Sequence, residues 1–146
     1  MKRTLLLLML FLSACRPILP ISAGMSEEFT LEPGQTVNII DQDLTITLDG
    51  VTSDQRCPAK IECAMSGPVS VKVTVQAGSE PPEEFTFQTF TDNDGRVPEV
   101  EFQGMQTRMS AWIYTIRIKS VLPFPQRSIS EIRDSEYRVS FVVSAK

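Results

Sequence analysis

The chain has 146 residues, of which 42% are hydrophobic and 22% are charged, and its formal net charge is −4. This length suits a single domain, and the hydrophobic fraction is that of a globular protein rather than a disordered chain. Histidine is absent, which excludes Ser-His and Cys-His nucleophile pairs and two-histidine zinc sites. The acidic balance argues against a nucleic-acid partner, because phosphate binding needs a surplus of lysine and arginine.

The first fourteen residues have the pattern of a signal peptide. Lys2 and Arg3 form a positive start, and an uncharged apolar run follows over residues 4–12. Such a run fits a signal-peptide core and is too short to span a membrane, which takes about 20 residues. Leu12-Ser13-Ala14-Cys15 resembles the lipobox of bacterial lipoproteins, at which the signal peptide is cut and the cysteine is acylated. An ordinary secretory signal is the alternative.

The lipobox resemblance implies that residues 1–14 are removed and that the thiol of Cys15 carries a diacylglycerol. A further fatty acyl chain, such as palmitate, would occupy the new amino group, and two chains suffice for stable anchoring. The mature chain would keep 12 basic and 18 acidic residues, a net charge near −6. Lipid rather than charge would therefore hold it at a membrane. Export also places the domain in an oxidising compartment, where disulfides persist.

Alternating polarity dominates the chain after this segment. Residues 16–26 contain two prolines and no clear periodicity, so we expect a tether that spans at most about 35 Å. Beyond it, period-two alternation of apolar and polar residues predicts strands, with Pro33-Gly34 as a turn between the first two. The predicted strands are residues 29–31, 37–39, 44–48, 69–75, 85–88, 100–102, 113–121 and 137–143.

These segments predict one all-β domain over residues 27–146. The expected architecture is an antiparallel β-sandwich of about seven strands, with a small β-barrel as the alternative. Alternation of apolar and polar residues is what an antiparallel sheet with one solvated face requires. Residues 128–135 are compatible with a helix, but the stretch is short.

Cys57 and Cys63 are left when Cys15 is assigned to the lipid. They have five residues between them and lie between two predicted strands, which in an exported domain predicts a local disulfide. A redox-active pair usually has Cys-x-x-Cys spacing, and metal ligation is a weaker alternative. A structural bridge would add about 2–3 kcal/mol in the chain-entropy model. Its main effect would be to hold residues 54–67, called the disulfide loop below, in one shape.

The loop also carries a resemblance. Asp54-x-Arg56-Cys57-Pro58, followed by Cys63 and Gly67, resembles the pattern of an uncharacterised family of small bacterial lipoproteins and exported domains. The Pro33-Gly34 turn, the valine-rich strand at 69–75 and the proline-containing turn at 121–125 agree with that family. Met65 stands where many members have tryptophan. The resemblance covers roughly residues 29–143 and implies a β-sandwich lipoprotein, without a known activity.

Five residues of the loop are candidate binding residues, because binding groups concentrate on loops held by a rigid scaffold. For Asp54 and Arg56 we favour a structural role, in which they hydrogen-bond each other or cap local backbone groups. A recognition surface made by Arg56, Lys60 and Glu62 is the alternative. The full candidate set is Asp54, Arg56, Lys60, Glu62 and Met65.

Other clusters have ordinary structural interpretations. Residues 92–95, Asp-Asn-Asp-Gly, resemble part of a calcium loop, but position 90 is phenylalanine, so a turn is predicted. Asp41 and Asp43 are expected in an inter-strand turn rather than in a catalytic pair. Methionines 65, 105 and 109 are expected to pack rather than to bind copper. Trp112 is expected at the edge of the core, although it and Phe124 are also candidates for an exposed aromatic platform.

These observations predict a non-enzymatic binding or structural module without metal or cofactor. It would be lipid-anchored outside the cytoplasm of a bacterial cell, at either the inner or the outer membrane, with an envelope protein or a glycan as its partner. The alternative function is an inhibitor or regulator of exported hydrolases, which requires the disulfide loop to protrude with its side chains outward. A hydrolase would instead require a concave site with converging polar groups.

Overall fold

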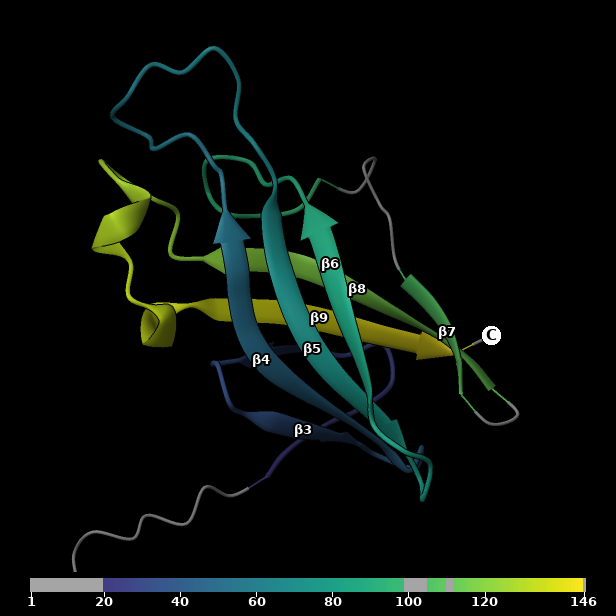
Figure 1. Ribbon diagram of the computed structural model, residues 1–146. Helices are drawn as coiled ribbons and strands as arrows, with labels where there is room; N and C mark the ends of the chain where they lie inside the picture. Colours follow the sequence, from purple (N-terminus) through teal and green to yellow (C-terminus); the bar gives the residue numbers. More distant parts are fainter. Residues whose placement is uncertain (1–19, 99–104, 110–111, 146) are drawn as a thin grey trace, which may run out of the picture.

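The strands of the chain form two β-sheets that pack face to face (Figure 1). The apolar residues at alternate positions of the strands form the core between them. The computed structural model describes residues 20–98, 105–109 and 112–145, with the backbone alone at 105–109 and 112. The strands in this part of the chain are β1 (Ile21–Ala23), β2 (Glu28–Leu31), β3 (Thr36–Ile39), β4 (Leu44–Asp54), β5 (Val69–Ala77), β6 (Glu83–Thr89), β7 (Met105–Met109), β8 (Trp112–Leu122) and β9 (Arg138–Ala145).

The two sheets form an open sandwich. One has the strand order β1-β3-β4-β5-β6, and the other has the order β2-β9-β8-β7. Every pair is antiparallel except β1 with β3, which is parallel. The predicted all-β sandwich is therefore confirmed, and the barrel alternative is wrong because neither sheet closes on itself.

The core lies between the inner faces of the sheets. Along β5, the four valines at 69, 71, 73 and 75 are fully buried, as the period-two geometry of a strand requires. Phe141 on β9 is also fully buried, and its ring stacks on Phe29 of the neighbouring strand with 5.9 Å between centroids. Burial of this apolar surface is the main favourable term for the fold.

The strand count differs from the sequence-based expectation. Nine strands occur in the described residues, rather than about seven, because β1 and β7 carry no alternation signal strong enough to predict them. The tether expected over residues 16–26 contains β1, so the ordered domain includes Ile21, whereas we expected it to begin at residue 27. The strand expected at 100–102 lies outside the described residues.

No α-helix occurs in the described ranges. Residues 128–135 instead give two short 3-10 turns, η3 (Ile129–Glu131) and η4 (Asp134–Glu136). Nowhere in this part of the chain is a helix long and apolar enough to cross a membrane.

The Pro33-Gly34 turn passes the chain from one sheet to the other. Strand β2 pairs with β9, whereas β3 pairs with β4. Gly34 has a positive φ of 84° and donates its N–H to the carbonyl oxygen of Leu48 at 2.7 Å. Glycine suits this position because residues with a side chain are strained there.

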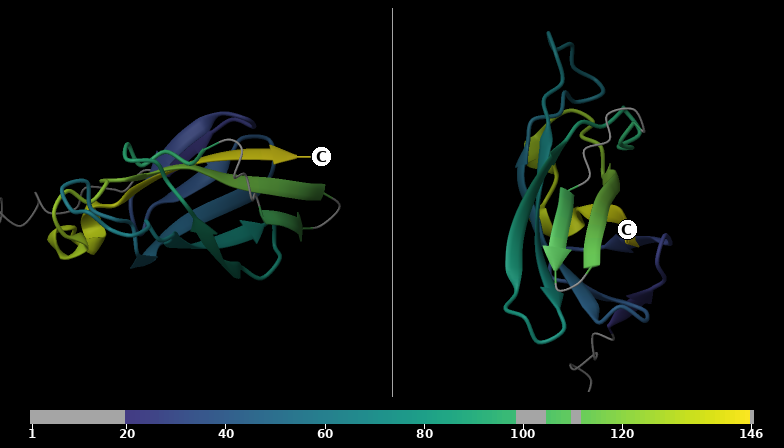
Figure 2. Two further views of the ribbon diagram at one scale, coloured as in Figure 1. Left: turned by 90° about the horizontal axis from the view of Figure 1, so that it is seen from above. Right: turned by 90° about the vertical axis from the view of Figure 1, so that its right-hand side faces the viewer.

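The disulfide loop extends the longest strand pair. Strands β4 and β5 pair from Leu44 with Ala77 up to Asp54 with Val69. Between these last two residues the chain leaves the sheet and projects beyond the end of the sandwich (Figures 1 and 2). The fold therefore presents this loop away from the body of the domain.

Candidate functional site

The neck of the disulfide loop continues the β4–β5 pairing by one residue on each strand. Gln55 donates its N–H to the carbonyl oxygen of Pro68 at 3.0 Å, and Gly67 donates to that of Gln55 at 2.9 Å. A Cβ at position 67 would lie 2.7 Å from both the Cβ and the carbonyl oxygen of Gln55. Real side chains do not approach this closely, so the glycine of the loop pattern is needed to close the neck.

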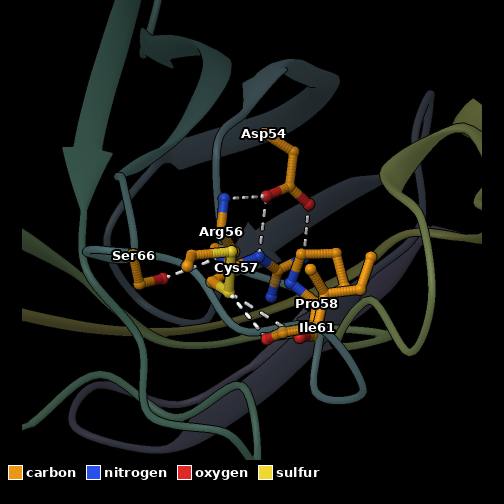
Figure 3. Close-up of a disulfide and its surroundings, with 7 residues drawn as sticks. Asp54, Arg56, Cys57, Pro58, Ile61 and Ser66 are labelled. Carbon is orange, nitrogen blue, oxygen red and sulfur yellow. Dashed lines mark hydrogen bonds and ion pairs between the residues drawn. A yellow bond between two sulfur atoms is a disulfide. The ribbon is translucent and has the colours of Figure 1, made fainter.

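A buried ion pair lies at the root of the loop (Figure 3). The side chain of Arg56 has no exposed surface, and that of Asp54 is 2% exposed. Arg56 Nε donates to Asp54 Oδ1 at 2.9 Å and Nη2 donates to Oδ2 at 2.6 Å. The backbone N–H of Arg56 also donates to Oδ1, at 3.1 Å. This two-pronged geometry is one that arginine adopts and lysine cannot.

The other donors of Arg56 bind the end of β8 and the segment that follows it. Nη1 donates to the carbonyl oxygen of Val121 at 2.7 Å, and Nη2 donates to that of Pro123 at 3.0 Å. The guanidinium carbon lies 5.2 Å from the ring centroid of Phe124, within the range of a cation–π contact. Arg56 therefore fastens the root of the loop to the opposite sheet.

Tyr137 completes the cluster from the position just before β9. Its hydroxyl donates to Asp54 Oδ2 at 3.1 Å. Burial of the phenol, followed by the charge of the Asp54 carboxylate, raises the pKa of Tyr137 from its ordinary value of 10 to about 12. The phenol therefore stays a neutral donor throughout the physiological range. We call Asp54, Arg56 and Tyr137, with the carbonyls of Val121 and Pro123, the root cluster.

The predicted disulfide between Cys57 and Cys63 is present. Its S–S distance is 2.11 Å and its Cα atoms are 6.0 Å apart. Beside it, Cys57 donates its N–H to Ser66 Oγ at 3.0 Å. Figure 3 also marks Cys57 Sγ near the carbonyl oxygens of Pro58 and Ile61. These are contacts rather than hydrogen bonds, because a sulfur in a disulfide carries no hydrogen.

The two sides of the loop are held differently. On the first side, Ala59 and Lys60 donate their N–H groups to the carbonyl oxygens of Pro125 and Gln126, each at 2.9 Å. The second side is tied back across the loop by the disulfide at Cys63 and by the hydroxyl of Ser66. The disulfide therefore restricts the second side of the loop by linking it to the first side, which is held by backbone hydrogen bonds.

The far end of the loop is open to solvent although its root is buried. Residues 60–65, which we call the tip, are all exposed. Met65 is 83% exposed and Ile61 is 49% exposed, and the charged side chains of Lys60 and Glu62 lie on either side of Ile61 in sequence. The tip thus presents exposed apolar side chains on a backbone that is held by the root of the loop and by the disulfide.

The five candidate binding residues separate into two groups. The predicted hydrogen bond between Asp54 and Arg56 is confirmed, whereas the alternative that placed Arg56 on a recognition surface is wrong, because its side chain is buried. Lys60, Glu62 and Met65 are exposed at the tip. The expectation that Met65 packs against the protein is also wrong, because the short loop holds it away from the core.

Four partners of Arg56 and Asp54 were not predicted from the sequence. They are Tyr137, the Phe124 ring, and the carbonyls of Val121 and Pro123 at the end of β8 and just after it. The proline-containing turn was noted as part of the family pattern, but nothing in the sequence indicates that it lies against the loop. Phe124 is 7% exposed, so it does not form an exposed aromatic platform.

The other candidate site residues either form turns or lie outside the residues that the structure describes. Asp92 Oδ1 accepts N–H groups from Asp94 at 2.9 Å and from Arg96 at 2.8 Å, which is turn chemistry. Asp41 and Asp43 have positive φ angles in the turn between β3 and β4. Among the described residues, no group of three acidic or cysteine side chains is placed to hold a metal ion. Cys15 and the side chains of Met105, Met109 and Trp112 lie outside the described part.

A shallow groove of about 740 Å³ lies beside the first side of the loop. Leu122, Phe124 and Ile132 contribute apolar surface to it, and Ser128 and Glu136 contribute polar groups. Those polar groups are engaged locally: Ser128 Oγ accepts the N–H of Ser130 at 3.2 Å, and Glu136 pairs with Arg133. These two polar side chains therefore already have partners within the protein.

Comparison with protein-family models, with curated proteins and with solved structures gives no match.

The root cluster predicts a large penalty for removing its cation. Arg56→Met leaves the Asp54 carboxylate buried without its counter-charge, which should lower the free energy of unfolding by about 3–5 kcal/mol. Arg133→Met is the matched control, because Arg133 also pairs with a carboxylate but is 78% exposed. The control should change stability far less, because an ion pair exposed to solvent contributes little. Equal effects in chemical denaturation would contradict the structural role of Arg56.

Tyr137 predicts a difference in alkaline stability. Its pKa is about 10 in the unfolded chain and about 12 in the folded protein, so the folded state holds this proton more tightly. The resulting stabilisation is complete below pH 10 and is lost as the pH rises through 12. Tyr137→Phe has no such proton, so the stability advantage of the wild type should shrink between pH 10 and pH 12. Denaturation of both proteins at pH 9 and pH 11.5 measures this, and a constant difference would refute it.

The neck predicts that Gly67→Ala is destabilising. The added methyl group meets the backbone of Gln55, and relief of the clash should cost about 1–3 kcal/mol. Gly24→Ala is the control, because the nearest atom to its new methyl is a flexible Glu27 carboxylate oxygen at 3.1 Å. Thermal and chemical unfolding compare the two. A Gly67 variant as stable as the Gly24 variant would show that the neck opens without cost.

Proposed function

We propose that this chain is a lipid-anchored, exported binding module without catalytic activity, which presents the tip of its disulfide loop to a protein partner. The observation that carries the proposal is the contrast between the two ends of the loop. Its root holds a fully buried arginine, whereas Met65 at its tip is 83% exposed. A loop with such a root keeps its shape before it meets a partner.

Pre-ordering favours binding, because association costs free energy for every side chain and loop that must be ordered. Here the disulfide, the neck and the backbone bonds from Ala59 and Lys60 already restrict the loop. An exposed apolar tip on a flexible loop would lose more of its binding energy to ordering. The construction of the loop therefore supports recognition, in addition to its contribution to stability.

The chemistry of the tip favours a protein over a glycan. Glycan sites are commonly built on exposed aromatic rings, and residues 54–67 contain no aromatic residue. Ile61 and Met65 instead offer aliphatic and thioether surface, and methionine is enriched at protein interfaces. The partner that fits is a protein with a concave apolar pocket bordered by polar groups that can meet Lys60 and Glu62.

Export and anchoring are supported by two independent features of the chain. The lipobox-like Leu12-Ser13-Ala14-Cys15 follows a signal-peptide core, and a structural disulfide is typical of an oxidising compartment. A lipid on Cys15 would place the module at a bacterial membrane, and the inner and outer membranes are equally compatible with this sequence.

An inhibitor of an exported hydrolase is the second candidate. A protruding loop with outward side chains is the shape that can enter an active-site cleft, and Figure 2 shows the loop extending past the end of the sheets. In this version Lys60, Ile61 and Glu62 would occupy the cleft. It differs from the first candidate only in the identity of the partner.

Loss of apolar surface at the tip tests the proposal. The double variant Ile61→Asp with Met65→Asp should reduce capture of the partner from envelope extract by at least about 10-fold, since 1.4 kcal/mol of lost contact has that effect. Ile40→Asp is the matched control, because Ile40 is 51% exposed and lies in the β3–β4 turn, outside the loop. Quantitative mass spectrometry compares proteins captured by the three acylated full-length chains.

The same experiment separates the two candidates. A captured protein that depends on the tip is assayed for hydrolysis with and without the module, and inhibition supports the second candidate. If every captured protein binds the tip variant as well as the wild type, the loop is not the binding surface. Acyl mass on Cys15 in the membrane fraction is measured in parallel.

A further inference from the structure

We infer that the four-stranded sheet carries a separate binding site on its outer face, for a short peptide with a free ammonium at one end and a free carboxylate at the other. The site is a hollow of about 840 Å³ lined by residues of β2, β8, β9 and the segment 94–97. It shares no residue with the disulfide loop, and the inference does not depend on the proposed lipid anchor or on the proposed partner of the loop.

The floor of the hollow contains a serine that points away from the core and is nevertheless buried. Ser140 on β9 lies between Val139 and Phe141, which both belong to the core. Successive side chains of a strand point to opposite faces of the sheet, so Ser140 faces outward. It is nevertheless only 7% exposed. A small side chain on an outer face is buried where longer neighbours surround it, so Ser140 lies at the bottom of a depression.

Ser140 belongs to a row of polar residues across the sheet. It pairs with Thr30 on β2 and with Ser120 on β8, and Ser120 also pairs with Arg96. Residues that pair directly across strands have their side chains on the same face, so this row lies on the outer face. The hydroxyls of Thr30 and Ser140 hydrogen-bond each other at 2.8 Å. Because a hydroxyl has one donor and two acceptor positions, Ser140 keeps capacity for a ligand.

Opposite charges line the hollow from its two sides. Glu28 lies on β2, whereas Arg96 lies on the segment that pairs with the far side of β8. Three strand spacings, about 14 Å, separate the two backbones. Both residues are exposed, and neither side chain has an ion pair within the described part of the chain. A guanidinium binds a carboxylate through two parallel hydrogen bonds, so a ligand with a carboxylate near Arg96 and an ammonium near Glu28 complements this arrangement.

The dimensions of the hollow select a peptide of two or three residues. An extended peptide spans about 3.5 Å per residue, so its termini lie about 7–10 Å apart, and the side chains of Glu28 and Arg96 reach across the remainder. The peptide amides then lie over Ser120 and Ser140, whose hydroxyls can donate to them and accept from them. Val97 also lines the hollow and offers apolar surface to the side chains of the peptide.

Other ligand classes fit this lining less well. Asp94 and Lys119 also line the hollow, so carboxylates and cations are present in equal number, and a purely anionic ligand meets repulsion as well as attraction. A neutral sugar would leave Arg96 and Glu28 without ionic partners, and the residues that line the hollow include no aromatic ring on which a sugar could stack. A zwitterionic peptide satisfies both signs of charge at once.

Trialanine is the probe, because its only charges are its two termini. Its affinity for the full-length chain in detergent micelles is measured by isothermal titration calorimetry, beside that of N-acetyl-trialanine amide and that of maltose. Arg96→Gln removes the guanidinium, and Ser120→Leu fills the floor of the hollow. Arg127→Gln is the matched control, because Arg127 is also exposed but does not line the hollow. Circular dichroism establishes that each variant is folded.

We expect the blocked termini, Arg96→Gln and Ser120→Leu each to weaken binding by at least about 10-fold, since each removes a charge-assisted contact or the space for the ligand. Arg127→Gln and the tip variant with Ile61→Asp and Met65→Asp should bind trialanine like the wild type. The inference is overturned if the blocked peptide binds as tightly as the free one, if maltose binds in its place, or if trialanine does not bind at about 10 mM. Loss of trialanine binding in the tip variant would place the peptide on the disulfide loop, which overturns this inference and leaves the proposed function standing.

Discussion

A guanidinium group without exposed surface must find its counter-charge and its hydrogen-bond acceptors inside the protein. Arg56 meets this requirement with Asp54 from the end of β4 and with two carbonyls from the end of β8 and the segment after it. Tyr137, just before β9, donates to the same carboxylate. Both sheets therefore contribute to one polar cluster at the root of the disulfide loop.

This cluster explains why a small loop needs both a disulfide and an arginine. The arginine fastens the root, and the backbone bonds to Pro125 and Gln126 fix the first side. Neither reaches the second side, which the Cys57–Cys63 bridge ties to the first. The root, the first side and the bridge together restrict the backbone that leads to the exposed tip, which is what the proposed binding role requires.

Sequence reasoning recovered the local features of this design and missed the contacts between distant segments. The Asp54–Arg56 pair was predicted because residues two apart in a loop meet readily. The partners at 121, 123 and 137 lie more than sixty positions away, and no pattern in the chain marks a carbonyl oxygen as an acceptor for a particular arginine. Met65 was misjudged for a related reason, since a methionine carries no sign of whether a loop turns it toward the core or into solvent.

Strand prediction shows the same division. The valines of β5 alternate so regularly that the strand and its buried face follow from local geometry alone. Strand β1 is three residues long and is held by parallel pairing with β3, so its existence depends on a neighbour rather than on its own residues. By itself, the order of amino acids determined the all-β class, the disulfide and the turns, because each depends on residues close in sequence. Only the tertiary structure decided that Arg56 is buried, that the tip is exposed and that β1 pairs with β3, because these depend on which distant segments pack together.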